Sequence, residues 1–373
     1  MSTGKKPRIA LVHDFLVQDG GAEQVLRVLA SMFPEAPIYT LIADYKKAAG
    51  TFDKNRIRTS FLQKYPFSIK KYQWYLPLMP RAIEAFDFDE YDIVISSASA
   101  FAKGVITGSQ TLHICYCHTP TRYLWTDTHS YIQALRVPYV LKKLLPILIA
   151  KLRNWDYQAA QRPDAFVANS KTVERRIKKY YRRNSKIIYP PVPVEMFQVQ
   201  SKKENYFLAG GRIVAYKRFD IVVEAFNRLK IPIKIFGTGP LLNELKNKAK
   251  SNIEFLGWTD DASVKNLYAS AKCFINPQEE DFGITMVEAL ASGCPVIAYN
   301  KGGAAEIVKD GVSGTLFDEQ TWESLANSVI RLREKEFDYS LIQSNAKQFS
   351  EKSFREKILN IIHEHRETSS NRS

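Results

Sequence analysis

Four carboxylates and one glycine lie within ten residues in the segment Glu279–Glu288, which reads EEDFGITMVE. A short apolar run before it, 272–277, closes with Asn-Pro and is typical of a buried strand followed by a turn. Helical spacing of apolar residues begins near Gly283, which places Glu280 in a loop and Glu288 about two turns further along, on a helix. Because an unpaired buried carboxylate costs several kcal/mol, the two acids predict contacts with different parts of one polyol or cationic ligand.

The turn into this predicted helix offers backbone donors as well as acids. Gly283 lets a ligand approach the main chain closely, because glycine has no Cβ. The amides of Phe282, Gly283 and Ile284 would be free at the start of the helix, a position that suits oxygen-rich or anionic ligands. We expect the neighbouring Glu279 and Asp281 to be solvated or structural.

A basic loop, Gly210–Arg218, follows the predicted strand 206–211. Two glycines leave its backbone open, while Arg212 and Lys217 bring a rigid and a flexible cation to one place, a combination that fits a diphosphate. Its place at the carboxyl end of a strand favours a ligand site, with a solvated turn as the alternative. The segment 237–240, Gly-Thr-Gly-Pro, lacks the third glycine of a dinucleotide fingerprint, so NAD binding is not predicted.

Two further glycine turns and one histidine are candidates for ligand contacts. Gly20 and Gly21 join the first predicted strand to the first helix, and Gly303 and Ala304 begin a short helix. The amides of both turns can receive a phosphate or a sugar, and tight turns without a ligand are the alternative. His118 ends the predicted strand 111–117, where open α/β sheets bind ligands.

Metal binding is the less favoured interpretation of two patterns. Cys115 and Cys117 lie beside His118, but no second cluster completes a set of four zinc ligands. Asp87-Phe88-Asp89 has the spacing of a metal-binding motif, although its place just before a strand favours a solvated turn. We therefore predict no metal and no other cofactor.

Predicted strands and helices alternate along the chain, which indicates an α/β fold with parallel sheets and covering helices. Predicted strands lie at 8–14, 37–42, 92–97, 111–117, 164–169, 206–211, 231–237, 253–256, 273–276 and 295–298; predicted helices at 170–180, 220–229, 241–250, 261–270, 284–292, 321–333, 339–349 and 353–365. Three prolines in 190–193 predict a stiff connection between domains. We expect an N-terminal domain over 1–190, a C-terminal domain over 191–350, and over 351–373 a helix that packs back on the N-terminal domain, followed by a disordered polar tail over 368–373.

The chain carries a formal net charge of +14, and all of the excess lies in its first half. Residues 1–190 hold 29 Lys and Arg against 15 Asp and Glu, whereas 191–373 hold 24 of each. The four cysteines lie in apolar runs without CxxC pairs, which favours reduced thiols in a cytoplasmic protein. We expect neither a secretory leader nor a membrane span.

Two segments, 56–81 and 132–153, mix basic residues with aliphatic and aromatic ones. This mixture indicates interfacial helices on an anionic membrane more than a track for nucleic-acid phosphates. Ordinary helices with solvated lysines are an equal alternative for each segment.

Taken together, these motifs resemble the retaining glycosyltransferases of family 4, which have the two-domain GT-B fold. The resemblance rests on the Glu-x7-Glu spacing from Glu280 to Glu288 around 282–284, on the loop 211–220, and on the segment 117–120, Cys-His-Thr-Pro. Within the family the chain is similar to the WbaZ-like bacterial mannosyltransferases of O-antigen and exopolysaccharide assembly. The resemblance implies two Rossmann-like domains that face each other across a cleft, with C-terminal helices closing the structure.

The resemblance also implies roles for the candidate residues. Arg212 and Lys217 would bind the donor diphosphate and neutralise the leaving group without a metal, and Glu288 would bind the ribose hydroxyls. Glu280 and the amides of Phe282, Gly283 and Ile284 would hold the transferred sugar, which His118 would face near its reacting carbon. The remaining donor-site candidates are loop residues near the diphosphate: Gly20, Gly21, Gly303 and Ala304.

The predicted partners are a nucleotide-sugar donor, with GDP-mannose first and UDP-hexoses next, and a polyprenyl-linked or oligosaccharide acceptor. The basic N-terminal half predicts a peripheral position on the anionic inner face of the plasma membrane, and no nucleic-acid partner. One rival function is a sugar-nucleotide 2-epimerase, which shares the fold but lacks an acceptor. The more distant rival is a basic nucleic-acid-binding protein.

Overall fold

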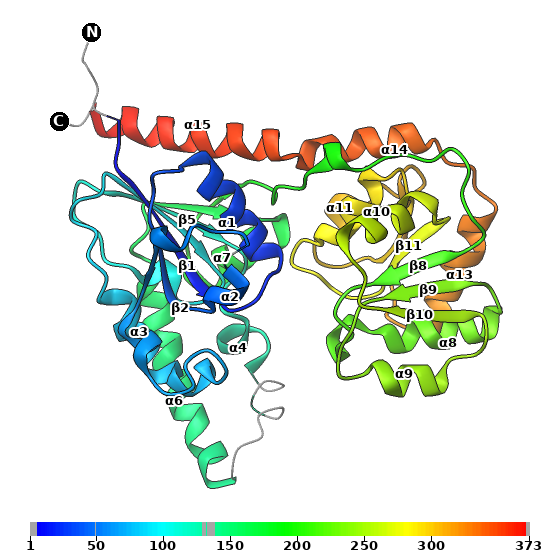
Figure 1. The fold of residues 1–373 in the computed structure, drawn as a ribbon, viewed down its shortest axis with the longest axis horizontal. Coiled ribbons are helices and arrows are strands. Elements are labelled where there is room, and N and C mark those ends of the chain that lie inside the picture. Colours follow the sequence, from blue (N-terminus) through cyan, green and yellow to red (C-terminus); the bar gives the residue numbers. More distant parts are fainter. Residues whose placement is uncertain (1–5, 49, 129–131, 133–138, 371–373) are drawn as a thin grey trace. The chain divides into compact units, whose positions relative to one another are not determined.

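The computed structural model describes residues 6–48, 50–128, 132 and 139–370, and Figure 1 shows the chain as a ribbon. The chain forms two compact units. The N-terminal unit comprises Met1–Tyr189 and Arg355–Ser373, and the C-terminal unit comprises Pro190–Phe354. The chain therefore passes between the units twice, once at the proline-rich connection and once inside the last helix.

The N-terminal unit is built on a parallel sheet of seven strands in the order β3-β2-β1-β4-β5-β6-β7. Its strands are β1 (Ile9–Leu16), β2 (Ile38–Ala43), β3 (Ile57–Thr59), β4 (Ile93–Ala98), β5 (Leu112–Cys117), β6 (Ala165–Ala168) and β7 (Lys186–Ile187). Its helices are α1 (Gly21–Met32), α2 (Tyr45–Ala48), α3 (Met79–Glu84), α4 (Arg122–Trp125), α6 (Tyr139–Ala159) and α7 (Lys171–Tyr181), with short 3-10 turns η1 (Lys54–Arg56), η2 (Phe61–Lys64), η3 (Tyr72–Leu78) and η4 (Ala102–Gly104). Strand order reverses between β1 and β4, which is where sheets of this kind bind ligands.

The C-terminal unit repeats this plan with six parallel strands in the order β10-β9-β8-β11-β12-β13. Its strands are β8 (Phe207–Gly210), β9 (Ile233–Phe236), β10 (Ile253–Gly257), β11 (Cys273–Asn276), β12 (Val296–Tyr299) and β13 (Gly314–Phe317). Its helices are α8 (Phe219–Leu229), α9 (Leu242–Lys248), α10 (Asp261–Ser270), α11 (Ile284–Ala291), α12 (Ala304–Ile307), α13 (Trp322–Arg333) and α14 (Tyr339–Ala346), with turns η5 (Val194–Met196), η6 (Ala215–Lys217) and η7 (Lys347–Phe349). The point of reversal lies between β8 and β11.

The central strands of each sheet are buried, as parallel sheets require. All six residues of β4 and all four residues of β8, β11 and β12 are buried. The helices bring one apolar face each; α7, for example, buries Val173 and Ile177, and Ser170 caps it by accepting a hydrogen bond from the Val173 amide. The prediction that Ser170 begins this helix is therefore confirmed.

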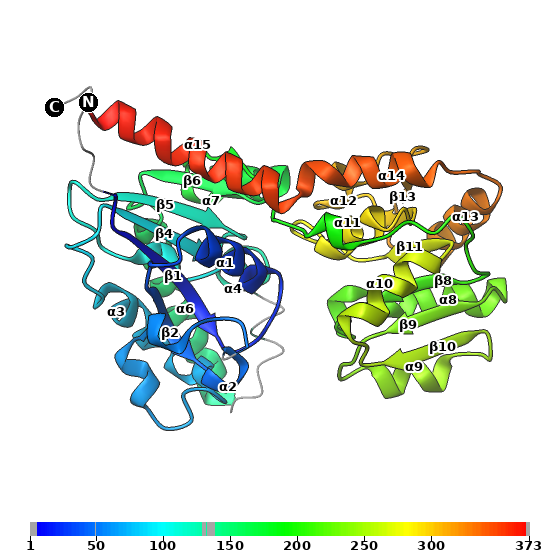
Figure 2. The same ribbon diagram turned by 45° about the horizontal axis from the view of Figure 1, so that its top comes forward.

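The last helix, α15 (Glu351–Ser370), lies along the N-terminal unit (Figure 2). The Arg355 guanidinium donates to the Ser31 hydroxyl at the end of α1 over 2.6 Å, and Lys186 of β7 pairs with Glu364. The prediction of a disordered tail from 368 is wrong for residues 368–370, since the helix continues to Ser370 without a glycine or proline to end it. Residues 371–373 lie outside the described part of the chain.

The prediction of an interfacial helix over 56–81 is also wrong. The segment forms β3, η2, η3 and the start of α3 instead, because Pro66 and Pro77 interrupt any longer helix and Phe67 has a left-handed backbone with φ 56°. The second segment, 132–153, contributes to α6 from Tyr139 onward, and its residues 133–138 lie outside the described residues. None of the helices described has the length and apolar content needed to cross a membrane.

Candidate active site

Two loops meet at the carboxyl edge of the C-terminal sheet, one after β8 and one after β9. Gly211 adopts φ +121°, and a Cβ at Gly237 would lie 1.9 Å from its carbonyl oxygen. A Cβ at Gly239 would lie 2.1 Å from the carbonyl oxygen of Ile213. The glycines of segment 237–240 thus allow the two loops to pack against each other, which accounts for a glycine pattern without a dinucleotide fingerprint.

Lys217 and Glu280, predicted separately from two motifs, form an ion pair. The Lys217 Nζ lies 3.2 Å from the Glu280 Oε1, and the two side chains are 12% and 23% exposed. The Gln278 side-chain amide donates to the same carboxylate oxygen over 2.9 Å. Arg212 is exposed, and its guanidinium reaches the Tyr216 hydroxyl at 3.4 Å. The structure therefore joins Lys217 to Glu280 and leaves Arg212 at the surface of the same loop.

The loop of Gly302 and Gly303 is tied to the acidic loop rather than left open. The Gly303 amide donates to the Glu280 carbonyl oxygen over 2.9 Å, and a Cβ at Gly303 would lie 2.0 Å from the carbonyl oxygen of Phe282. This amide is therefore already engaged, and it holds the backbone of Glu280 in place. Ala304 opens the four-residue helix α12.

Helix α11 begins as the sequence predicts, at a glycine with a left-handed backbone. Gly283 has φ +109°, and a Cβ there would lie 2.2 Å from the Met286 Cε. No acidic residue lies in the first turn of α11, so its N-terminal amides keep their positive potential. The Phe282 side chain is buried, with its ring 5.6 Å from that of Phe349, which leaves only its backbone for a ligand.

Glu288 lies on α11, as predicted, and its carboxyl group is in an unusual environment. Burial raises its pKa to about 7; the Asp261 carboxylate adds to this effect and Lys265 opposes it. The Tyr268 hydroxyl lies against it, and burial together with the Glu288 carboxylate raises the pKa of Tyr268. A strongly raised pKa of a carboxyl group is typical of a binding or catalytic residue.

Polar residues at and near the carboxyl end of β11 were not predicted as part of the site. The Gln278 side-chain amide donates to the Asn276 oxygen as well as to Glu280, and Gln278 Oε1 is buried with no hydrogen-bond partner in the described structure. Gln320 accepts from Arg218 and donates to the Pro277 carbonyl oxygen. The Asn-Pro pair indicated only a turn, although polar residues at the carboxyl end of a buried strand were a usable signal.

In the N-terminal unit, the predicted residues lie at the carboxyl edge of the sheet and at the start of α1. Gly20 is the N-cap of α1, Gly20 and Gly21 are exposed, and no side chain caps the helix. The His118 side chain is buried, and its Nε2 lies 2.8 Å from the Ser97 Oγ. Burial, with His13 adding to the effect, lowers the pKa of His118 to about 3, so the ring is neutral at neutral pH.

His13 and Glu23 were missed in this unit. The His13 Nδ1 lies 3.2 Å from the same Ser97 Oγ, and its Nε2 lies 3.7 Å from the Glu23 Oε1. Both side chains are almost fully buried. His13 follows the rule that singled out His118, since it lies near the carboxyl end of a strand, and applying that rule to every strand would have found it.

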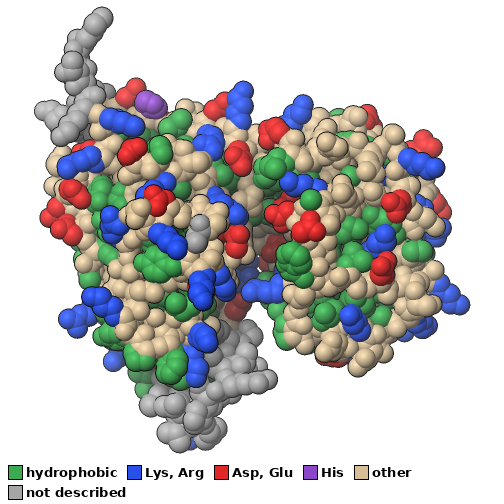
Figure 3. Space-filling view, in the orientation of Figure 1, with side chains coloured by type: hydrophobic (Ala, Val, Ile, Leu, Met, Phe, Trp, Pro, Cys, Tyr) green, Lys and Arg blue, Asp and Glu red, His purple; other side chains and the backbone are tan. Residues whose placement is uncertain are grey.

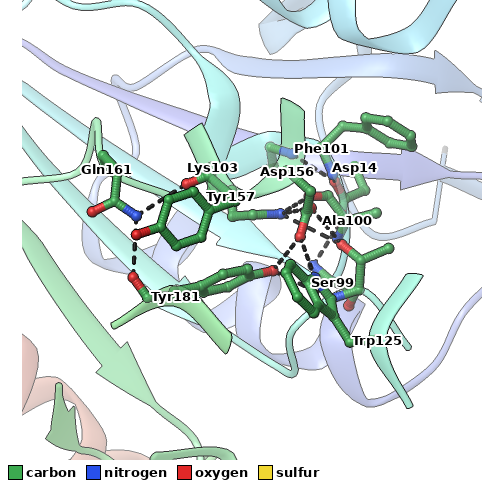
Figure 4. Close-up of polar contacts among 12 residues, drawn as sticks. Asp14, Ser99, Ala100, Phe101, Lys103, Trp125, Asp156, Tyr157, Gln161 and Tyr181 are labelled. Atoms are coloured by element: carbon green, nitrogen blue, oxygen red, sulfur yellow. Dashed lines mark hydrogen bonds and ion pairs between the residues drawn. The ribbon is translucent and has the colours of Figure 1, made fainter. Parts of the chain in front are cut away.

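A buried carboxylate supports the turn after β4 (Figure 4). Asp14 accepts hydrogen bonds from four consecutive backbone amides, at 2.6 Å from Ser99, 2.9 Å from Ala100, and 2.7 Å each from Phe101 and Ala102. These amides would otherwise lie unpaired at the start of η4. Asp14 therefore fixes the backbone beyond Ser97.

A buried ion pair supports the loop that follows His118 (Figure 4). The Lys103 Nζ donates to Asp156 Oδ1 over 2.5 Å, and the Thr121 hydroxyl donates to the same oxygen over 2.8 Å. The other oxygen of Asp156 accepts from the Trp125 indole at 2.7 Å and from the Tyr181 hydroxyl at 2.8 Å. One carboxylate on α6 thus joins η4, the loop after β5, α4 and α7.

The candidate metal motifs form other structures. Cys115 and Cys117 are buried free thiols, and burial raises the pKa of Cys115 to about 12. The Asp87 side chain accepts from the Asp89 amide at 2.9 Å, which closes a turn before β4. Among the residues placed by the structure, no three His, Cys, Asp or Glu side chains gather as metal ligands.

Two family models match the chain in succession. The model for glycosyltransferase family 4 matches residues 19–196, and the model for glycosyl transferases group 1 matches residues 193–353. The first match contains Gly20, Ser97 and His118 of the N-terminal ligand edge, and the second contains the Lys217–Glu280 pair. The chain belongs to glycosyltransferase family 4. Its two parallel sheets with covering helices are those of the GT-B fold, as the sequence predicts.

Family 4 relatives with curated descriptions share about a quarter of their aligned residues with this chain. The O-antigen chain mannosyltransferase C of Escherichia coli is 27% identical over 234 residues, which cover 58% of this chain and 61% of that protein. An uncharacterized glycosyltransferase of Methanocaldococcus jannaschii is 28% identical over 199 residues, covering 52% and 56%. The chain therefore matches less than two thirds of the length of these two relatives. The alpha-1,3/1,6-mannosyltransferase of Dictyostelium discoideum is 24% identical, covering 74% and 76%.

Solved glycosyltransferase structures confirm the fold. Anabaena HepE, solved in complex with UDP and glucose, matches with a TM-score of 0.70 at 18% identity, covering 96% of this chain and 100% of that one. Sucrose-phosphate synthase from Thermosynechococcus elongatus matches with a TM-score of 0.72 at 15% identity, covering 97% and 100%. At such low identity the likeness concerns architecture.

Proposed function

We propose that this family 4 protein transfers mannose from GDP-mannose, with retention of configuration, to a polyprenyl-linked or oligosaccharide acceptor. The observation that carries the proposal is the Lys217–Glu280 pair at the ligand edge of the C-terminal sheet. A partly buried cation and a partly buried carboxylate at one point match a donor that has a diphosphate beside a sugar. The choice of mannose is supported by the descriptions of the Escherichia coli and Dictyostelium relatives as mannosyltransferases.

Donor binding in this proposal exchanges the partners of the ion pair. The diphosphate takes Lys217 and the exposed Arg212, and the Glu280 carboxylate is released to accept hydrogen bonds from the sugar hydroxyls. Each charge-assisted contact to the diphosphate contributes roughly 1.5–3 kcal/mol, and together they stabilise the leaving group without a metal. Retention follows if the acceptor attacks from the side of the departing phosphate, whose oxygen takes the proton of the acceptor hydroxyl.

A panel of GDP- and UDP-sugars, each with Mg²⁺ and with EDTA, tests the donor by thermal shift. A ligand at 100 times its Kd adds about 2.7 kcal/mol of stability, so a true donor gives a clear rise in Tm. Lys217→Met should abolish the rise. Lys248→Met is the matched control, because Lys248 also pairs with a glutamate of this unit, Glu244, at 2.6 Å. A flat response of the wild type to every nucleotide sugar would contradict the proposal.

The two glutamates have separable roles. Glu288→Ala should chiefly raise the KM for the donor, since we assign Glu288 to the ribose hydroxyls, whereas Glu280→Ala should chiefly lower kcat. Equal, mild effects of the two substitutions would mean that the pair is structural. Release of free nucleoside diphosphate only when an acceptor is present separates a transferase from a 2-epimerase.

The segment between Asp53 and Glu84 favours an anionic membrane as the place of action. It contains seven Lys and Arg and no acidic residue. Phe67 and Trp74 are 65% and 63% exposed, and the Lys71 Nζ lies 4.1 Å from the centre of a Trp74 ring. On the face drawn in Figure 3, basic and hydrophobic side chains lie side by side over the lower part of the N-terminal unit. Exposed aromatic rings beside lysines suit the interface of an anionic bilayer.

Co-sedimentation with vesicles at low salt tests this position. The wild type should bind vesicles that contain anionic lipid, and Phe67→Ala with Trp74→Ala should weaken the binding severalfold. Trp258→Ala is the control, because Trp258 is 77% exposed but belongs to the C-terminal unit. Failure of the wild type to bind anionic vesicles would remove the membrane from the proposal and leave the donor assay unaffected.

A further inference from the structure

Four polar side chains form a continuous row of contacts at the ligand edge of the N-terminal sheet. His13 on β1 and Ser97 on β4 are direct neighbours in the parallel ladder, and His118 follows the end of β5. Glu23 comes from the first turn of α1. The contacts run from Glu23 Oε1 to His13 Nε2 at 3.7 Å, from His13 Nδ1 to Ser97 Oγ at 3.2 Å, and from Ser97 Oγ to His118 Nε2 at 2.8 Å.

The hydrogen-bond partners decide which atoms of this row of side chains carry the protons. The His13 Nδ1 also lies 3.1 Å from the Ser97 carbonyl oxygen, which can only accept, so Nδ1 carries a proton. The Ser97 hydroxyl oxygen faces that N–H group on one side and His118 Nε2 on the other. Its own proton must then point to His118 Nε2, because no other acceptor for it is found among the described residues. The His118 Nε2 is therefore the unprotonated nitrogen, and Nδ1 carries the proton.

The other end of this row of side chains is the Glu23 carboxylate. Burial alone would raise the pKa of the Glu23 carboxyl, but the neighbouring His13 holds it below its ordinary value, so Glu23 is ionised at neutral pH. The Glu23 Oε1 faces the second nitrogen of His13, Nε2, at 3.7 Å on the side of the ring away from Ser97. The Glu23 Oε2 is buried without a hydrogen-bond partner in the described structure and points toward the turn at Gly20, where a Cβ would lie 3.2 Å from it.

We propose that Glu23, His13 and Ser97 are positioning residues that hold His118 in the Nδ1–H tautomer, so that it presents a neutral hydrogen-bond donor to an oxygen of the substrate. The inference rests on the proposed function for the contact between His118 and the sugar. The tautomer matters because a histidine held in the wrong tautomer loses its function even when its position is unchanged. His118 is thus assigned the role of a donor rather than of a general base.

Strand β4 supplies an internal control, because the residue before Ser97, Ser96, makes the same kind of contact on the opposite face of the sheet. The Ser96 Oγ lies 2.8 Å from the Nε2 of His113, both side chains are fully buried, and burial lowers the pKa of His113 to about 3. His113 is the second residue of β5 and pairs with Val94 of β4, so it lies near the amino end of the strand, five residues before His118 and away from the ligand edge. Ser96→Ala and Ser97→Ala therefore remove equivalent hydroxyls with different expected consequences.

Histidine-selective ¹⁵N NMR on the full-length protein reads the tautomer directly, without substrate, with the His118 signals assigned by their loss in His118→Asn. The wild type should show His118 protonated at Nδ1, and Ser97→Ala should shift its two nitrogen signals toward a mixture of tautomers. Ser96→Ala should move only the signals of His113. A wild-type His118 protonated at Nε2 would overturn the proposal, whether or not a donor has been identified.

Kinetics separate positioning from general stability. Ser97→Ala should lower kcat roughly tenfold, the scale of one hydrogen bond in the transition state, with the KM for the donor changed less than twofold. Ser97→Thr keeps the hydroxyl and should restore most of kcat, and Glu23→Gln should lower kcat without unfolding the protein. Equal losses of kcat in Ser96→Ala and Ser97→Ala, or no recovery in Ser97→Thr, would contradict the proposal.

Discussion

Glu288 on α11 makes the stability of the C-terminal unit depend on pH. Its pKa is raised to about 7, chiefly by burial, from an ordinary value of 4.5. Because the folded state binds this proton more tightly than the unfolded state, the native unit loses stability as pH rises from 4.5 through about 7. The full loss of stability applies above about pH 7, and no stability is lost below about pH 4.5.

The two pKa values set the size of the effect. Their separation corresponds to roughly 3 kcal/mol at about 1.36 kcal/mol for each tenfold change. By linkage, ionisation of Glu288 costs the native unit about 1 kcal/mol at pH 5 and about 3 kcal/mol at pH 8. Glu288→Gln removes the titration and keeps the shape of the side chain. The variant should therefore gain about 2 kcal/mol more, relative to wild type, at pH 8 than at pH 5.

Thermal unfolding of wild type and Glu288→Gln at pH 5 and pH 8 measures how much the stability gain of the variant changes between the two pH values. For a unit of this size about 1 kcal/mol moves the Tm by roughly 2–4 °C, so the gain of the variant at pH 8 should exceed its gain at pH 5 by about 4–8 °C. Comparing the two pH values cancels whatever the amide itself does to stability. Glu254→Gln, at an exposed position on β10, should show the same difference from wild type at both pH values.

One result would refute this reasoning. If the difference between Glu288→Gln and wild type is the same at pH 5 and pH 8, burial does not raise the Glu288 pKa in the folded protein. The same titration has a functional counterpart. If ribose hydroxyls donate to the ionised carboxylate, donor binding near pH 7 releases a proton, which calorimetry in two buffers of different ionisation enthalpy detects.

Three further substitutions test the scaffold of the site. Lys103→Met leaves Asp156 as an unpaired buried charge and should cost roughly 3–5 kcal/mol in urea unfolding, and a cost below 1 kcal/mol would show that the pair is solvated. Gly237→Ala forces a Cβ to within 1.9 Å of a backbone oxygen and should cost at least about 3 kcal/mol, whereas Gly257→Ala, also at positive φ but with open space around it, should cost about 1 kcal/mol. Asp14→Ala leaves four backbone amides without their acceptor and should cost roughly 3 kcal/mol or more; an unchanged midpoint would mean that water replaces the carboxylate.

Much of the fold could be predicted from the sequence, because buried parallel strands are apolar runs and helices carry periodic apolar faces. The predicted helix 261–270 and strand 273–276 coincide with α10 and β11. The edge strands β3 and β13 escaped prediction. β3 has three residues and an exposed arginine, and β13 begins with a glycine. Their pairing with β2 and β12 defines them more than their own composition does.

The interfacial helix predicted over 56–81 failed for a related reason. Its basic and aromatic composition was read as a helix, although Pro66 and Pro77, two of its three prolines, break the helical period. The exposed Phe67 and Trp74 nevertheless keep the composition that suggested a membrane surface. The composition of the segment therefore indicated that basic and aromatic side chains lie on this surface. The backbone conformation was set instead by the prolines.

The candidate site shows what single motifs leave out. Sequence spacing found Lys217 and Glu280 but assigned them to separate parts of the donor, since nothing in either motif indicates that the loops after β8 and β11 bring the two side chains to 3.2 Å. The pairing changes the chemistry, because without a ligand the Lys217 ammonium is already neutralised by Glu280. Lys217 then binds a diphosphate favourably when the Glu280 carboxylate gains another partner in exchange. In the proposed function, Glu280 gains such a partner from a donor that has hydroxyls next to its diphosphate. The exchange therefore favours a nucleotide sugar over a free nucleotide, and a Lys217→Met variant should lose much of its preference for the sugar-bearing ligand along with its affinity.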